Sequence, residues 1–73
     1  MKKALYKALM ARFIAEQKEA VATLEVYYNN PAGIGEHPQV VEEMAKQIEK
    51  LSNAEDCIST LERWNPLLHS EHE

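Results

Sequence analysis

The sequence predicts an all-α protein, an antiparallel helical hairpin that self-associates into a helical bundle. Apolar residues recur at intervals of three and four in two long runs, which is typical of helices with one packed face. Both glycines and two of the three prolines fall between these runs. We expect one domain, residues 1–73, with helices at about 3–29 and 38–64, a loop at 30–37 and a short C-terminal tail at 65–73.

The first helix is expected to end near Asn29. Pro31 disfavours the helical conformation of the residue before it, and its ring cannot continue a helix. Gly33 and Gly35 accept positive φ angles without strain, so the chain can reverse direction there.

The second helix is expected to begin near Pro38, because a fixed φ and a missing N–H suit the first turn of a helix. His37 then lies at or beside the N-cap. The pair Asn65-Pro66 is expected to end this helix as Asn30-Pro31 ends the first.

The first helix carries more apolar surface than one partner helix can cover. Two stripes follow helical spacing: Met10, Ile14, Gln17, Val21, Leu24 and Tyr28, and beside them Leu5, Leu9, Phe13, Ala20, Leu24 and Tyr27. A helix that is apolar on most sides is covered on most sides. We therefore expect an oligomer interface formed by Leu5, Leu9, Met10, Phe13 and Ile14.

The second helix has one clearer stripe. It contains Val41, Met44, Ile48, Leu51, Ile58 and Leu61, with Val40, Ala45 and Ala54 beside it. A single core below roughly 70 to 80 residues rarely supplies more than about 3 to 5 kcal/mol, so two lone helices are marginal. The simplest prediction is a dimer that forms a four-helix bundle, and higher cyclic assemblies remain open.

Charge is distributed unevenly along the chain. Residues 1–18 hold five basic side chains and one acidic one, a net charge of +4, and the remainder holds three bases and eleven acids, a net charge of −8. In an antiparallel hairpin, the basic start of the first helix lies beside Glu55, Asp56 and Glu62. The overall charge of −4 disfavours a nucleic-acid interface, although the basic N-terminal turn remains either a contact surface or a solvated face.

Several function classes find no support in the sequence. Cys57 is the single cysteine, so an intrachain disulfide is excluded, and no apolar run approaches the roughly 20 residues of a membrane span. His69 and His72 fit a solvated tail better than a metal site, so we expect no metal and no cofactor. Cys57 has no histidine at contact spacing on its helix, and we expect no enzyme. A cytoplasmic protein without membrane contact is the expectation.

The loop is the candidate ligand site. Gly33 and Gly35 lead into the N-terminus of the second helix, where free N–H groups and the helix dipole attract anions. His37 adds a proton-dependent charge, and Tyr28 could stack on a base. Two plainer interpretations stay open. The glycines serve only to reverse the chain, and the aromatic side chains only cap the core.

The segment from Tyr27 to Pro38 resembles a family. With Val41-Glu42-Glu43 and Ala54-Glu55-Asp56, it is similar to small, largely uncharacterised proteins of tailed bacteriophages that share an Asn-Pro-x-Gly-Ile-Gly-Glu-His loop between two helices. The resemblance covers about residues 20–64 and is specific only in the loop. It implies an accessory protein made in the cytoplasm of an infected bacterial host, and it transfers no functional residue.

Three functions from different classes follow as hypotheses. The first is a non-enzymatic oligomeric binding module that captures a host factor or a nucleotide-like host defence signal. The second is a structural, assembly or protein-interaction hairpin in the phage particle or the replication machinery. The third is an enzyme, for which only the loop histidine could be invoked.

Overall fold

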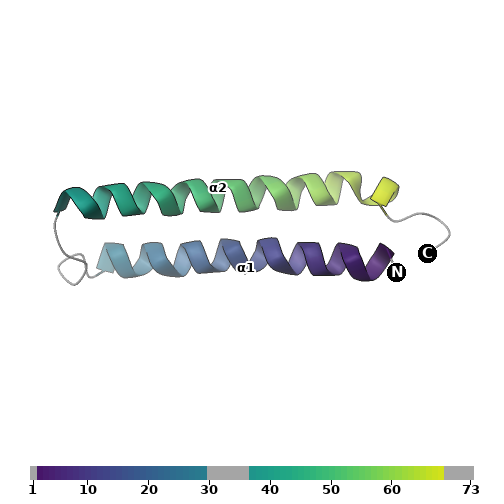
Figure 1. Ribbon diagram of the computed structural model, residues 1–73, viewed down its shortest axis with the longest axis horizontal. Coiled ribbons are helices and arrows are strands. Elements are labelled where there is room, and N and C mark those ends of the chain that lie inside the picture. The colour runs from purple at the N-terminus through teal and green to yellow at the C-terminus, as the bar shows by residue number, and fades with distance from the viewer. Residues whose placement is uncertain (1, 30–36, 69–73) are drawn as a thin grey trace.

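The computed structural model describes residues 2–29 and 37–68. Each range is one helix, α1 at Lys2–Asn29 and α2 at His37–Leu68, and the two pack side by side in opposite directions (Figure 1). The predicted all-α antiparallel hairpin is therefore confirmed. The predicted loop, 30–37, lies outside the described residues except for His37.

The hairpin is a rod, because its helices have 28 and 32 residues, which correspond to about 42 and 48 Å at 1.5 Å per residue. The molecule measures 54 × 15 × 13 Å. Its radius of gyration of 16.4 Å exceeds the roughly 11 Å of a compact domain of this length. Such a shape leaves most side chains near solvent.

The two helices meet along one seam with the four-and-three spacing of a coiled coil. In the described part of the chain, every residue of the seam is buried or half-buried. In α1 the seam consists of Tyr6, Met10, Phe13, Gln17, Ala20, Leu24 and Tyr27. In α2 it consists of Val40, Met44, Gln47, Leu51, Ala54, Ile58, Leu61 and Asn65. These are the core positions a and d of a heptad.

An ion pair between the helices fixes their register. Lys50 of α2 donates to the carboxylate of Glu19 of α1. Because the helices are antiparallel and the a positions of one helix face the d positions of the other, this contact places Ala20 opposite Leu51, and Ala54 opposite Gln17. Ala20 and Ala54 are fully buried, so each allows a close approach of the facing helix. Small residues opposite larger ones let the two layers interdigitate.

The core of this seam is thin. Among the described residues, the buried apolar side chains are Ala20, Leu24, Val40, Ala54 and Leu61, and no large side chain is fully buried. The side-chain oxygens of Gln47 and Asn65 are buried within the seam without a hydrogen-bond partner among those residues. Buried oxygens of this kind reduce stability, because each has lost its hydration.

The predicted apolar stripes are partly wrong. Val41 and Ile48 were expected in the seam of α2, yet they are 70% and 50% exposed, and Val40 and Gln47 take the seam positions. In α1, Val21 and Tyr28 are also exposed. The physical reason is that one four-and-three spacing holds along the whole seam. This spacing places Gln47 in the seam, although its neighbour Ile48 is the more apolar residue.

The predicted end of the second helix is also wrong, because α2 continues through Asn65 and Pro66 to Leu68. A proline lacks one N–H and therefore removes one hydrogen bond to the preceding turn. So close to the end of a helix, the loss of one hydrogen bond reduces stability but does not prevent the last residues from being helical. Figure 1 shows the final turn of α2 tilted away from the axis of the rest of the helix. The tail beyond it, 69–73, lies outside the described residues.

Replacing Gln47 with leucine tests the seam. Gln47→Leu removes a buried, unpaired oxygen and is expected to raise the free energy of unfolding by about 1 to 2 kcal/mol. The measurement is thermal or urea unfolding at equal protein concentration. Gln39→Leu is the control, because Gln39 is exposed and a substitution there should stay within about 0.5 kcal/mol. A loss of stability in Gln47→Leu would show that the amide is satisfied in solution.

Candidate functional site

The loop end of the hairpin is the end where α1 finishes and α2 begins (Figure 1). Tyr28, in the last turn of α1, is 73% exposed. His37 is the first residue of α2, and Gly33 and Gly35 lie outside the described residues. Of the predicted ligand site, the structure therefore places an exposed tyrosine at the same end of the rod as the start of α2.

The start of α2 has the polarity that attracts anions. The first N–H groups of any helix lack intrahelical acceptors, and the helix dipole adds partial positive charge there. The first turn of α2 contains no acidic residue. In the sequence, Glu36 directly precedes it and Glu42 follows. The helix start therefore favours an anionic group, with a carboxylate close on each side.

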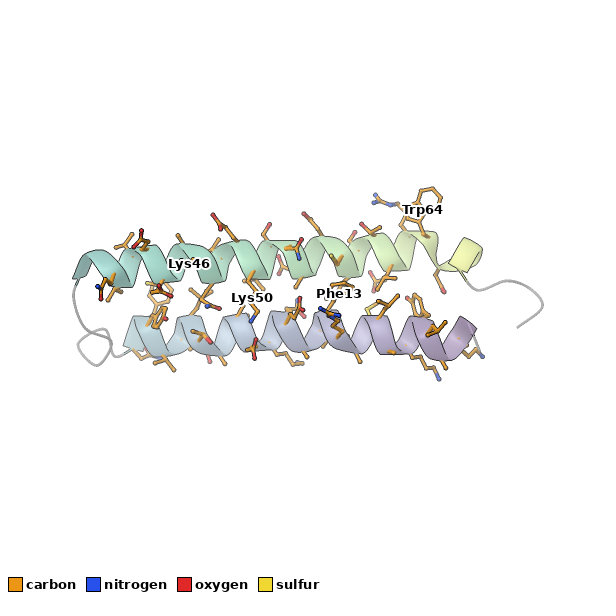
Figure 2. The ribbon with its side chains drawn as sticks, in the orientation of Figure 1. Phe13, Lys46, Lys50 and Trp64 are labelled. Atoms are coloured by element: carbon orange, nitrogen blue, oxygen red, sulfur yellow. The ribbon has the colours of Figure 1, made fainter. Side chains whose placement is uncertain are left out.

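The five residues predicted as an oligomer interface fall into two groups. Leu5 and Leu9 are 61% and 44% exposed, so their side chains are available to a partner. Met10, Phe13 and Ile14 are half-buried. Figure 2 shows Phe13 between the two helices, and Met10 shares its seam.

One exposed surface was missed by the sequence analysis. We call it the apolar flank: Ile14, Val21 and Tyr28 of α1, with Val41 and Ile48 of α2. These residues occupy the e positions of both helices, directly beside the seam, and antiparallel helices bring their e positions to the same side. The sequence signal was present, because the members within each helix are seven residues apart.

A shallow depression adjoins the apolar flank on α1. It has a volume of about 390 Å³ and is lined by Gln17, Lys18, Val21, Ala22 and Glu25. All of these residues belong to one helix, and the small side chain of Ala22 leaves the hollow. The depression is open to solvent, which suits the side chain of a neighbouring molecule better than an enclosed ligand.

The opposite flank is charged near its middle. Lys50 reaches Glu19 across the two helices, while Arg12 pairs with Glu16 at 3.5 Å and Lys46 with Glu43 at 3.2 Å within one helix each. The hydrogen bond from Lys50, and then its positive charge, lower the pKa of Glu19 below its ordinary value. These exposed pairs contribute little stability, but the first of them links residues 31 positions apart and so selects the register.

The remaining candidates for chemistry are dispersed. Trp64 is 48% exposed and projects from α2 on the side away from α1 (Figure 2). Cys57 is half-buried. Within residues 2–29 and 37–68, no cluster of three or more His, Cys, Asp or Glu side chains is arranged to hold a metal ion, and His69 and His72 lie outside these ranges.

Comparison with known proteins finds no matching family model, no matching curated protein and no matching solved structure. Neither α1 nor α2, as far as they are described, has an apolar stretch of the length that crosses a membrane.

Replacing Lys50 tests the link between the helices through its pH dependence. Because the pKa of Glu19 is lower in the folded protein than its ordinary 4.5, the ion pair stabilises the fold above that value, and this stabilisation is lost as the pH falls below it. Lys50→Met is therefore expected to lower the melting temperature at neutral pH and to have less effect at about pH 3.

The control for this experiment is Lys18→Met, which removes an exposed lysine from the other side of α1. It should leave the acid dependence of stability as in the wild type. If Lys50→Met and Lys18→Met changed the pH dependence equally, general charge and not the Lys50–Glu19 contact would explain the effect.

Proposed function

We propose that this chain is a non-enzymatic, oligomeric binding module that captures a host factor or a nucleotide-like host defence signal in the cytoplasm of an infected bacterium. The observation that carries the proposal is the exposure of Tyr28 at the loop end, where α2 also begins. The resemblance of the loop to small proteins of tailed bacteriophages supports the cellular setting.

A nucleotide-like ligand suits this end of the hairpin because it combines a phosphate with a flat base. The phosphate matches the free N–H groups at the start of α2, and glycines such as Gly33 and Gly35 allow a backbone to approach closely. Tyr28 offers an exposed ring for stacking on the base, and His37 offers a charge that depends on pH.

Self-association is part of the proposal. A seam with so little buried apolar surface stabilises a hairpin weakly, and several large apolar side chains lie exposed beside it. A homo-oligomer covers these side chains without requiring a second gene product. Leu5 and Leu9 are exposed on one side of the rod, and the apolar flank lies on the other.

The role is non-enzymatic in this proposal because the nucleophilic side chains of α2 lack a base. Ser52, Cys57, Ser59 and Thr60 have no histidine at contact spacing on their helix.

The second candidate function is a structural or assembly hairpin that packs against another protein of the particle or the replication machinery. The observation that favours it is the extent of exposed apolar surface along both helices, which also suits a large protein partner.

Native mass spectrometry of the protein purified from bacterial cells separates the two candidates. The binding module predicts a discrete multiple of 8.4 kDa that carries an added mass of a few hundred daltons, released on denaturation. A bare oligomer, or one held to another protein chain, would instead favour the structural role.

A substitution in the loop then tests the site. Gly35→Val is expected to strain the turn and reduce the fraction of oligomer that carries the added mass at least tenfold, with the oligomer itself unchanged. Ala32→Val is the control, because it lengthens a side chain in the same loop at a residue that already has a Cβ atom. If Gly35→Val retained the ligand as the wild type does, the loop would not be the site.

A further inference from the structure

The apolar flank is continuous over the half of the rod that ends at the loop. Starting from that end, the register of the seam gives the order Val41, Tyr28, Ile48, Val21. These side chains are 70%, 73%, 50% and 40% exposed, and Glu55 of α2 and then half-buried Ile14 of α1 come next. Towards the open end of the rod the same e positions continue as Glu62 and Lys7.

We propose that the apolar flank packs against the same flank of a second copy, related by a two-fold axis parallel to the helices. This inference rests on the self-association in the proposed function and names its surface and symmetry. The result is a four-helix bundle in which α1 of each copy lies beside α2 of the other, and every neighbouring pair of helices is antiparallel.

An axis in this direction keeps residues at the same height along the rod. Tyr28 of one copy then meets Val41 of the second copy, and Val21 meets Ile48 of the second copy. Each contact occurs twice because of the symmetry. Val41, Ile48 and Val21 are thereby covered, while Tyr28, in the last turn of α1, contacts Val41 through one face of its ring and keeps the other face open at the loop end.

Charge complementarity selects this orientation. At the open end of the rod, Lys7 of one copy lies level with Glu62 of the second copy, and the reverse contact forms as well. Within one described copy, no ion pair joins Lys7 to Glu55 or Glu62, so the lysine remains available. With a two-fold axis perpendicular to the rod, two copies that overlap fully would place the apolar half of each against the charged half of the other. Two copies that match only their apolar halves would overlap over half their length.

The available area also fits a dimer. The whole side of the rod that carries the e positions, 54 Å long and 15 Å wide, offers on the order of 800 Å², close to the roughly 800 Å² that each partner contributes to a standard interface, and the apolar flank makes up about half of it. Beside the flank on α2 the exposed residues are small: Ala45, Ser52 and Ser59. The depression next to Val21 on α1 provides space for a side chain of the facing copy.

Charge substitutions at the centre of the flank test the surface. Ile48→Lys is expected to raise the dissociation constant of the dimer at least tenfold, because symmetry places the new charge in the interface twice. The measurement is sedimentation equilibrium, with far-ultraviolet circular dichroism to follow the helices. Leu5→Lys is the matched control, since Leu5 is 61% exposed but belongs to the other side of α1, and its effect should stay within about threefold.

Each outcome of this comparison has a distinct meaning. If Ile48→Lys kept the mass of the wild type, or if only Leu5→Lys dissociated, the apolar flank would not be the interface, while self-association would stand. If the wild type itself were a monomer of 8.4 kDa at micromolar concentration, the self-association in the proposed function would fail together with the interface.

A charge exchange tests the direction of the axis without changing any apolar residue. One variant is Lys7→Glu, and the other combines Glu55→Lys with Glu62→Lys. Each variant alone places like charges across the proposed interface. A mixture restores both contacts, because each copy then supplies the charge that the other lacks.

Native mass spectrometry of the mixture, with one variant labelled with nitrogen-15, counts the mixed dimers. The parallel axis predicts mixed dimers several-fold above their statistical proportion in low salt and a smaller excess in high salt. Mixed dimers in purely statistical proportion in low salt would contradict this orientation. This holds whatever the stability of each variant alone, because both variants retain the whole apolar flank.

Discussion

The rod is built around the packed seam between α1 and α2. Its heptad spacing is continuous in both helices, and this continuity fixes every other surface of the rod, since the residues beside the seam are determined once its register is set. The seam contains fully buried alanines and partly buried glutamines, so the helices approach closely but bury little apolar area. The seam therefore sets one register for the two helices, but the small apolar area that it buries stabilises the hairpin only weakly.

The consequence of a weak seam is visible on both sides of it. Val41, Ile48 and Tyr28 are half or more exposed on one side, whereas the other side holds the Lys50–Glu19 contact and further ion pairs. In the proposed dimer, a second copy on the apolar flank supplies the burial that the seam lacks. The same dimer brings the two loop ends to the same end of the bundle, so that any ligand site there is present in two copies.

The fold could be predicted from the sequence because its signals are local. Asn30-Pro31 and the two glycines stop one helix, Pro38 suits the start of the next, and the apolar period identifies both as helices. The packed face could not be predicted so well, because Val40 and Val41, or Gln47 and Ile48, are adjacent and hydrophobicity alone favours the wrong member of the second pair. Only the register of the whole seam decides which residue of each pair is packed.

The end of α2 was misjudged because one proline near a helix end removes one hydrogen bond without stopping the helix. The candidate loop site depends on Gly33 and Gly35, for which the sequence is the sole guide.

If the hairpin needs the proposed second copy for its stability, dilution of the wild-type protein will separate the copies and unfold the helices together. Helical circular dichroism and molar mass are followed together from high micromolar to nanomolar concentration. The mass is expected to fall towards 8.4 kDa over the same concentration range in which the helical signal decreases, because dissociation exposes the apolar flank and leaves only the thin seam. A mass of 8.4 kDa with full and concentration-independent helicity throughout would contradict it.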